Sequence, residues 1–282
     1  MAGMTAADAV DLHAAAARAA LFRNLHTPGE PLLMPNPWDA GSARVLASLG
    51  FAALATTSSG FAGTLGRLDG QVTLDEVLAH AAVIAAATDR PVSADFENGF
   101  ADEPAGVAEN VTRAAATGLA GCSIEDFTGR ADDPIYAAGL AAERVAAAAQ
   151  AAHAGPVRLV LTARAENYLH GRADLGDTIA RLQRYQEAGA DVLYAPGLTE
   201  PGDIRAVVSA VDRPVNVLAL PAAPPVAALA ELGVARVSVG GAFAWAALDA
   251  LAAAGRELLE SGTYGYLSQS AAGRQVAGPA FG

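Results

Sequence analysis

Residues 91–126, PVSADFENGFADEPAGVAENVTRAAATGLAGCSIED, contain one complete unit of the pattern that decides the fold. The apolar run at 91–95 predicts a strand, the alanine-rich run at 104–117 predicts a helix, and the apolar run at 120–125 predicts the next strand. Gly118 lies between this helix and the second strand, where a glycine commonly ends a helix. The order strand, helix, strand is typical of parallel strands that are joined by a covering helix.

The same unit repeats along the chain on both sides of this stretch. Strands are expected at 31–35, 52–56, 91–95, 120–125, 157–163, 191–195, 214–218 and 235–239. Helices are expected near 38–49, 73–88, 104–117, 139–154, 174–188, 201–210, 222–232 and 242–254. Eight strands that alternate with eight helices predict an α/β fold of the (β/α)8 TIM-barrel type, with a doubly wound open sheet as the alternative.

The barrel is expected to form a single domain over residues 1–282, because no linker or change of composition divides the chain. An alanine-rich helix is expected at about 5–25, before the first strand. A helical tail is expected at about 255–268, after the eighth unit, and the Gly/Ala/Ser-rich residues that follow are expected to be mobile.

Charge and cysteine content restrict the class of protein. The net charge of −12 would repel nucleic acid, so nucleic-acid binding is not expected. Cys122 is the only cysteine, which excludes an internal disulfide and a zinc-type Cys/His cluster and suits a reducing cytoplasm. The first twenty residues do not resemble a signal peptide, and no uninterrupted apolar run is long enough for a membrane span. A cytoplasmic protein that does not bind membranes is therefore predicted.

Acidic side chains follow neighbouring strands of the predicted barrel. Because the carboxyl ends of parallel strands meet at one rim, the acids near the ends of strands two, three and four should converge there: Asp69, Asp95, Glu97 and Glu125. Clustered carboxylates repel one another unless a positive charge joins them, and hard oxygen ligands select Mg²⁺, or Mn²⁺, over zinc. For any one of these acids alone, a helix cap or a solvated loop position is the simpler explanation.

Two further features suggest how an anionic molecule could bind at this rim. Arg164 follows the fifth strand and could hold a carboxylate or phosphonate through two parallel hydrogen bonds; the alternative is an ion pair with Glu166 or Glu125. The glycine-rich stretch after the second strand could offer backbone N–H groups to an anion, and it could equally be a plain flexible loop. The positions concerned are Ser58, Ser59, Gly60 and Phe61.

In these segments the chain resembles the isocitrate lyase/phosphoenolpyruvate mutase superfamily from about residue 20 to about residue 260. The similar segments are NPWDAGSARVLASLGFAAL (36–54), TTSSGFAGTLGRLDG (56–70), PVSADFENGFAD (91–102), GCSIED (121–126) and LTARAEN (161–167). Each segment alone is a weak signal, but together and in this order they are specific.

The resemblance implies roles for individual residues. Asp95 would contact Mg²⁺ directly, while Asp69, Glu97 and Glu125 would hold its water ligands. Substrate contacts would come from Ser58, the Ser59 hydroxyl, the N–H groups of Gly60 and Phe61, Asp95, Arg164 and Asn216; Arg164, Ser59 and Glu125 are the expected catalytic residues. The segment FTGRADDPIYAAG, after Asp126, would be a gating loop that closes over the substrate.

The chain also departs from the family pattern. Lyases that cleave isocitrate or methylisocitrate carry a Lys-Lys-Cys-Gly-His motif in the gating loop, and this loop has no Lys, Cys or His. Pro196 stands where the mutases have a histidine after the sixth strand. The expected function is therefore a Mg²⁺-dependent lyase or decarboxylase that acts on a small 2-oxo or 2-hydroxy carboxylic acid through an enolate. The alternatives are phosphonopyruvate hydrolase or mutase chemistry and a non-catalytic acid-binding barrel. The resemblance also implies a homotetramer or a dimer.

Overall fold

A single parallel barrel forms the body of the protein in the computed structural model, which describes residues 11–282. Its strands are β1 (Leu32–Met34), β2 (Leu54–Ala55), β3 (Val92–Asp95), β4 (Gly121–Glu125), β5 (Val160–Arg164), β6 (Val192–Tyr194), β7 (Val215–Leu218) and β8 (Arg236–Ser238). The strand order is β1-β8-β7-β6-β5-β4-β3-β2, without the central reversal of a doubly wound sheet. β1 and β2 approach each other at the remaining gap, where the Ala55 N–H donates to the Pro35 carbonyl at 3.1 Å. The predicted (β/α)8 barrel is confirmed.

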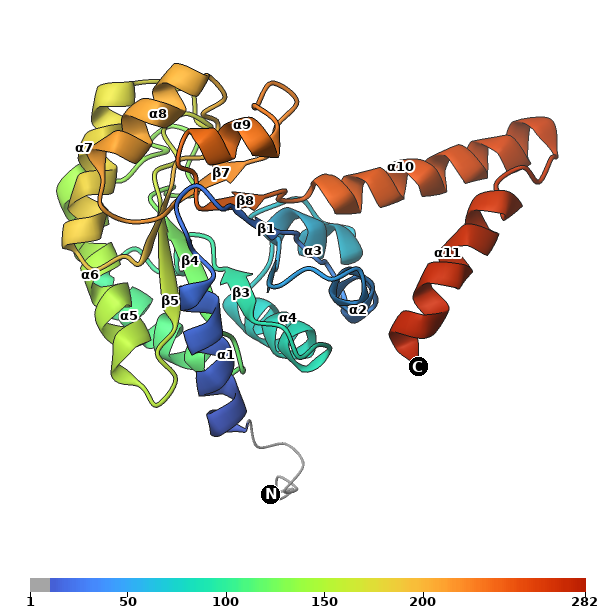
Figure 1. Ribbon diagram of the computed structural model, residues 1–282, viewed down its shortest axis with the longest axis horizontal. Coiled ribbons are helices and arrows are strands. Elements are labelled where there is room, and N and C mark those ends of the chain that lie inside the picture. Colours follow the sequence, from blue (N-terminus) through green and yellow to red (C-terminus); the bar gives the residue numbers. More distant parts are fainter. Residues whose placement is uncertain (1–10) are drawn as a thin grey trace.

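Helices lie outside the strands, as Figure 1 shows. Those that follow β1 to β8 are α2 (Ala40–Ser48), α4 (Leu74–Ala86), α5 (Pro104–Ala115), α6 (Ala138–Ala154), α7 (Leu175–Glu187), α8 (Pro201–Ala210), α9 (Val226–Glu231) and α10 (Ala242–Arg256). Local sequence fixes where several of them begin. Thr73 and Glu76, for example, form a reciprocal capping box at the start of α4.

Helix α1 (Leu12–Asn24) packs against the amino-terminal end of the barrel (Figure 1). Asp11 caps it by accepting hydrogen bonds from the N–H groups of His13 and Ala14. Phe22 is fully buried and lies so close to Gly121 that a Cβ there would be 2.9 Å from its ring. The predicted helix near 5–25 is therefore present from residue 12, and the part before residue 11 lies outside the described residues.

One helix stands where the sequence analysis expected a loop. Helix α3 (Ser58–Thr64) follows β2 directly, and Thr57 caps it through a hydrogen bond from the Gly60 N–H. Gly60 allows close packing at this point, since a Cβ there would be 2.6 Å from the Thr57 side chain and 3.2 Å from Ala244 in α10. The two glycines of α3 did not prevent a helix because its neighbours fix its position.

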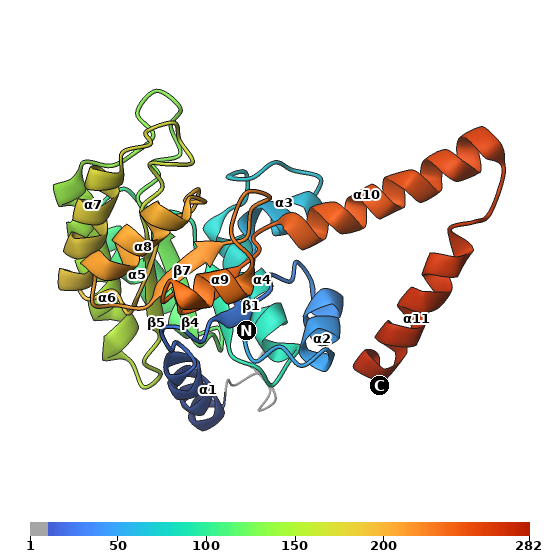
Figure 2. The same cartoon turned by 45° about the horizontal axis from the view of Figure 1, so that its top comes forward.

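The C-terminal arm, residues 242–281, matches the prediction in α10 and differs from it beyond that helix. After α10 come a π-helical turn, η1 (Glu257–Ser261), and a further helix, α11 (Leu267–Phe281). The chain is thus helical well beyond residue 268, where a mobile end was expected. Figures 1 and 2 show α10 extending away from the barrel and α11 turning back toward it. Phe281 lines an apolar groove with Trp38, Val45 and Phe243.

The barrel interior is polar at the carboxyl ends of the strands and apolar toward the helices. Outward-facing strand residues such as Leu54, Leu161 and Leu193 are fully buried under the helices. Cys122 is also buried in this core, and burial raises the pKa of its thiol to about 12, which fits the expected packing role. Among residues 11–282, no helix is both long and apolar enough to span a membrane.

Candidate active site

A cavity of about 250 Å³ opens at the carboxyl ends of the strands. Residues from the ends of β1 to β8 and from α3 line it, and most of the polar ones are serines, threonines and asparagines. Four charged residues line it: Asp69, Asp95, Arg164 and Arg236. The first three are predicted from the sequence, whereas Arg236 is not, because an arginine within the apolar run 235–239 carries no motif of its own.

Arg164 ends β5 and is surrounded by carboxylates. Its Nη1 lies 2.8 Å from Asp95 Oδ1, its Nη2 lies 3.1 Å from Glu125 Oε2 and its Nε lies 2.7 Å from Glu166 Oε1. Burial alone would lower the pKa of Arg164, but the carboxylates of Glu166, Glu125 and Asp95 hold it well above the ordinary value. The ion pairs that stood as an alternative to substrate binding are therefore present in the structure.

The acids around Arg164 are themselves largely removed from water. Burial raises the pKa of Glu125 well above its ordinary value, although Arg164 opposes this shift. Burial likewise raises the pKa of Glu166, whose backbone N–H donates to Asp126 at 2.8 Å. The neighbourhood thus holds more acid than Arg164 alone can neutralise.

Asp95 is held by the segment that follows β2. Its backbone N–H donates to Thr56 Oγ1 at 2.9 Å, and its Oδ2 accepts the Ser58 N–H at 3.0 Å. The same carboxylate accepts from Arg164 through Oδ1. Asp95 therefore connects the start of α3 with the end of β5. Thr56 was not singled out from the sequence, since a threonine at a strand end is common.

Glu97 is the most constrained of the predicted metal ligands. Its φ of 44° lies in the left-handed region that side chains other than glycine rarely adopt. Its carbonyl accepts the Glu125 N–H at 2.9 Å, while its buried Oε1 has no hydrogen-bond partner within residues 11–282. Burial, followed by the charges of Asp95 and Asp69, raises the pKa of Glu97 to about 8.

Asp69 comes from the loop that follows α3 and lines the cavity. Burial, followed by the charge of Asp95, raises the pKa of its carboxyl. Glu97 and Glu125 do not line the cavity, but they adjoin it through Asp95 and Arg164. All four predicted metal ligands are thus brought to one end of the barrel.

A buried arginine holds the turn that carries Glu97. The Arg144 guanidinium donates to the backbone carbonyls of Asn98, Ala101 and Asp102, and it lies 4.0 Å from the centre of the Tyr136 ring. This places α6 behind the turn and opposes relaxation of its strained backbone. Arg144 could not be identified from the sequence, because its partners are backbone atoms far away in the chain.

The donor set fits a divalent cation that keeps some of its water. Asp69, Asp95, Glu97 and Glu125 are hard oxygen donors, and the unpartnered Glu97 Oε1 is a buried atom that needs a positive neighbour. In residues 11–282, no group of three or more acidic, histidine or cysteine side chains is arranged to coordinate an ion directly. Because Mg²⁺ usually retains several waters, the acids fit best with one or two direct contacts and the remainder through water.

The segment expected to bind an anion is organised differently from the prediction. The Gly60 N–H donates to Thr57 Oγ1 at 3.3 Å and the Phe61 N–H donates to the Thr57 carbonyl at 3.0 Å, so both serve the first turn of α3. Phe61 stacks on His80 at 3.9 Å between ring centres. Ser58 and Ser59 do line the cavity. Anion binding by the Gly60 and Phe61 amides remains a prediction that requires this turn to rearrange.

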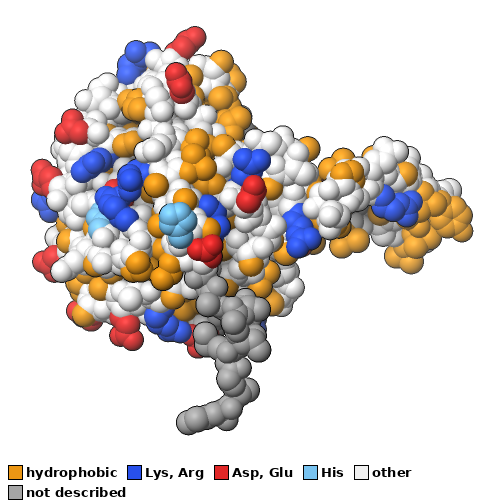
Figure 3. All heavy atoms as spheres, turned by 60° about the horizontal axis from the view of Figure 1, so that its bottom comes forward, with side chains coloured by type: hydrophobic (Ala, Val, Ile, Leu, Met, Phe, Trp, Pro, Cys, Tyr) orange, Lys and Arg blue, Asp and Glu red, His pale blue; other side chains and the backbone are white. Residues whose placement is uncertain are grey.

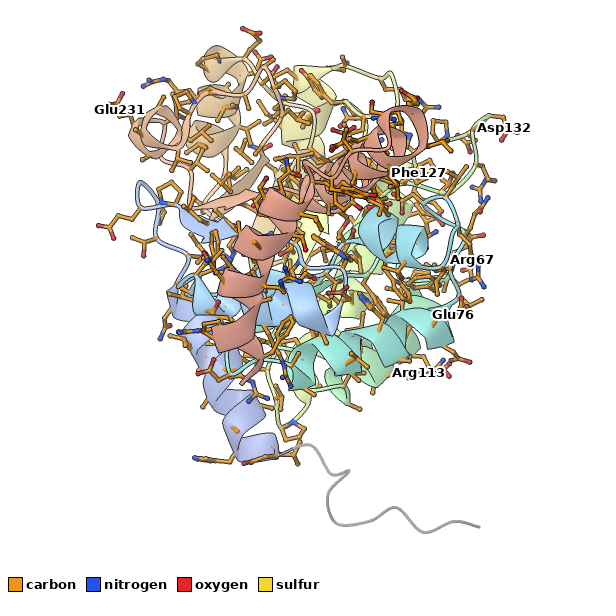
Figure 4. All side chains as sticks on the ribbon, turned by 90° about the vertical axis from the view of Figure 1, so that its right-hand side faces the viewer. Arg67, Glu76, Arg113, Phe127, Asp132 and Glu231 are labelled. Carbon is orange, nitrogen blue, oxygen red and sulfur yellow. The ribbon has the colours of Figure 1, made fainter. Side chains whose placement is uncertain are left out.

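The expected gating loop forms a compact hairpin between β4 and α6. Phe127 and Ile135 form an antiparallel bridge, and the Thr128 N–H donates to the Pro134 carbonyl at 2.8 Å. The Phe127 ring stacks on His170, from the loop after β5, at 3.9 Å between ring centres. Figure 4 shows Asp132 at the outer edge of the molecule, farther out than Phe127.

The comparison with known proteins is consistent with this arrangement. The family model described as phosphoenolpyruvate phosphomutase matches residues 22–259. The chain belongs to the isocitrate lyase/phosphoenolpyruvate mutase superfamily. The match includes every strand, every predicted metal ligand and Arg164, so the superfamily relationship extends over the whole barrel.

Three similar proteins illustrate this superfamily. A crystal structure from Burkholderia cenocepacia, described as a lyase/mutase, is 53% identical, with a TM-score of 0.89 and coverage of 94% of this chain and 95% of the other. An uncharacterized protein of Mycobacterium tuberculosis is 36% identical over 83% of this chain and 87% of its own length. The crystal structure of 2,3-dimethylmalate lyase is 27% identical, with a TM-score of 0.79 and coverage of 89% of each chain. The protein is thus an enzyme of a lyase and mutase superfamily.

Proposed function

We propose that the protein is a Mg²⁺-dependent lyase that cleaves a C–C bond, or removes CO₂, in a small 2-oxo or 2-hydroxy carboxylic acid through an enolate. The observation that carries this proposal is the surplus of buried acid around Arg164, with an unpartnered Glu97 oxygen, beside a cavity at the carboxyl ends of the strands. Such a surplus disfavours an anionic substrate unless a cation is present. The cavity of about 250 Å³ suits a small acid.

Asp95, Glu97, Asp69 and Glu125 would hold the cation, with Mn²⁺ as a possible substitute. When bound, the cation supplies positive charge opposite the oxygen on which negative charge develops. Arg164 would bind the substrate carboxylate. A guanidinium has five N–H donors, and two of them donate to Asp95 and Glu166, while Nη2 lies 3.1 Å from Glu125 as an ion pair, so N–H groups remain for a ligand.

The gating loop of this chain has no cysteine, so proton transfer is assigned to other groups at the site. Burial raises the pKa of Glu125, so this carboxyl takes up a proton more readily than an exposed glutamate does. Such a carboxyl can deliver a proton to the enolate carbon after bond cleavage. The Ser59 hydroxyl, 3.3 Å from Thr57 Oγ1, is available to bind the developing oxyanion.

A substrate screen tests this proposal. Oxaloacetate, substituted malates, methylisocitrate and phosphonopyruvate are offered with Mg²⁺ and, in parallel, with excess chelator. Metal-dependent release of a 2-oxo acid or CO₂ supports the proposal. Release of inorganic phosphate from phosphonopyruvate would instead indicate P–C chemistry, and tight binding of an acid without any turnover would indicate a binding protein.

We also propose that the protein is a homotetramer, or at least a dimer, and that it is cytoplasmic. The C-terminal arm exposes large apolar side chains, including Trp245, Leu251, Leu259 and Tyr264, with Leu259 86% exposed. Figure 3 shows hydrophobic side chains gathered at the far end of this arm. Exposed apolar side chains gathered in this way usually pack against another chain. Light scattering at micromolar concentration checks the assembly, and a monomeric mass would contradict it.

A further inference from the structure

Arg236, the first residue of β8, lies in the barrel interior and contacts Thr162, which comes two residues before Arg164 on β5, so it lies deeper in the barrel than the acidic cluster. It is only 3% exposed and lines the same cavity as Arg164. Its Nε donates to Asn216 Oδ1 at 2.9 Å, its Nη2 donates to Thr162 Oγ1 at 3.1 Å and its Nη1 lies 3.2 Å from His26 Nε2. The side chain therefore reaches from β8 to β5 and forms the floor of the cavity.

All three partners of Arg236 are neutral. Burial, followed by the charge of Arg236, lowers the pKa of His26 to about 3, so its ring is uncharged at neutral pH. His26 Nδ1 lies 2.8 Å from the Phe22 carbonyl, which fixes the proton on Nδ1 and leaves Nε2 to accept from Arg236. Within residues 11–282, no aspartate or glutamate forms an ion pair with Arg236.

The floor of the cavity therefore carries a buried positive charge without a counter-ion. Burial, followed by the charge of Arg164, lowers the pKa of Arg236 to about 9, which still leaves the guanidinium charged at neutral pH. A buried charge is costly unless an opposite charge joins it. Three of its five N–H donors have protein partners, so two remain for a group inside the cavity.

We propose that Arg236 is the residue that binds a second anionic group of the substrate, at the floor of the cavity. One carboxylate would lie at the rim near Arg164 and the cation, and the other would lie at the floor on Arg236. Ser93 and Ser123 also line this cavity. This inference rests on the proposed function, because it assigns the far end of the same substrate. Asn216, which was expected to contact substrate, then acts by orienting Arg236.

A matched pair of ligands tests this subsite. Malate and 2-hydroxybutyrate have the same carbon skeleton and differ by one carboxylate, which a methyl group replaces. Calorimetric titration in Mg²⁺ gives the affinity of the wild type, Arg236→Met and Arg236→Lys for each acid. Arg236→Met should lower the affinity for malate by at least tenfold, which is about 1.4 kcal/mol of binding free energy. It should change the affinity for 2-hydroxybutyrate by less than about twofold. Arg236→Lys keeps the charge but not the planar donors, and should lose part of the preference for malate.

Thermal unfolding provides the structural control. Methionine replaces a buried, unpaired cation with an apolar side chain, so Arg236→Met should melt no lower than the wild type without ligand. Malate should raise the melting temperature of the wild type and not that of the variant. If Arg236→Met does not fold, Arg236→Lys decides the question through the same ratio of affinities.

The outcomes separate this inference from the proposed function. Equal losses for both acids, or an unchanged preference for malate in the variants, would overturn the diacid subsite. Equal affinity of the wild type for both acids would also overturn it, while the proposed function would stand. A wild type that binds neither acid would count against the proposed function and against the subsite with it.

Discussion

Arg236 is buried and Arg164 is largely buried, and both face the same cavity, yet their surroundings have opposite electrostatic character. Arg164, at the rim, contacts three carboxylates, whereas Arg236, at the floor, contacts an amide, a hydroxyl and a neutral imidazole. The rim therefore carries excess negative charge, which suits a cation. The floor carries uncompensated positive charge, which suits an anion. The difference shows that the partners of a buried arginine, and not its burial, determine what it can bind.

Removal of the central rim carboxylate should have the largest effect. Asp95→Ala should lower activity by about 10²-fold or more, because Asp95 is the acid that joins the start of α3, Arg164 and the expected cation. The barrel should still fold, since Glu125 and Glu166 still compensate Arg164. Steady-state kinetics with circular dichroism measure both quantities. Glu109→Ala, which removes an exposed acid of α5 that does not line the cavity, is the control. Full activity of Asp95→Ala would remove the basis for an acidic cation site.

Replacement of the rim arginine should have the next largest effect. Arg164→Lys keeps the charge but loses the planar donors, so kcat/KM should fall at least tenfold, or about 1.4 kcal/mol. Because three carboxylates lose part of their compensation, the melting temperature should also fall, by roughly 2–4 °C for each 1 kcal/mol lost.

Arg67→Lys is a matched control for this variant. Arg67 pairs with Glu76 on the outer surface, where Figure 4 shows both side chains away from the barrel centre. Exposed ion pairs contribute little to stability, so neither kinetics nor melting should change measurably. A large loss of stability in Arg164→Lys with normal ligand affinity would restrict Arg164 to a structural role.

The smallest effect is a pH-dependent change in stability at Glu97. Its pKa is about 8 in the folded chain and near the ordinary 4.5 when unfolded, so the folded state binds more protons between these values. The stability linked to this proton is fully present below about 4.5 and is lost as pH rises through 8. In chelator at pH 8, Glu97→Gln should therefore have a higher melting temperature than the wild type. The difference should be roughly 2–4 °C for each 1 kcal/mol by which the free energy of unfolding rises.

Added Mg²⁺ should reverse this order by stabilising the wild type more than Glu97→Gln. Melting curves at pH 5 and pH 8, with chelator and with Mg²⁺, check the prediction. Glu109→Gln, at an exposed position of α5, should behave as the wild type does. A variant indistinguishable from wild type in all four conditions would show that Glu97 carries no such proton.

Much of the rim was predictable from sequence, because parallel strands place their carboxyl ends together. Asp95, Glu125 and Arg164 each end a strand, and the eightfold repeat was enough to bring them to one rim. The apolar strand runs and the helix-ending glycines carried this information locally.

The features that were not predictable depend on contacts distant in the chain. Arg236 lies within an apolar run, and its partners Asn216, Thr162 and His26 belong to three other parts of the barrel. Helix α3 was predicted as a loop because its glycines disfavour a helix, while its packing against α10 became visible only in three dimensions. The length of α11 was missed for the same reason.

Direct measurement of cation binding tests the central claim most closely. Mn²⁺ is paramagnetic and shares the oxygen-ligand preference of Mg²⁺, so electron paramagnetic resonance of free Mn²⁺ reports how much the protein binds. At pH 8, the wild type should bind one Mn²⁺ per chain, Mg²⁺ should displace it, and Asp95→Ala should bind none at the same concentrations. If the wild type binds no more Mn²⁺ than Asp95→Ala does at millimolar concentration, the acidic rim is not a cation site and the proposed chemistry is wrong.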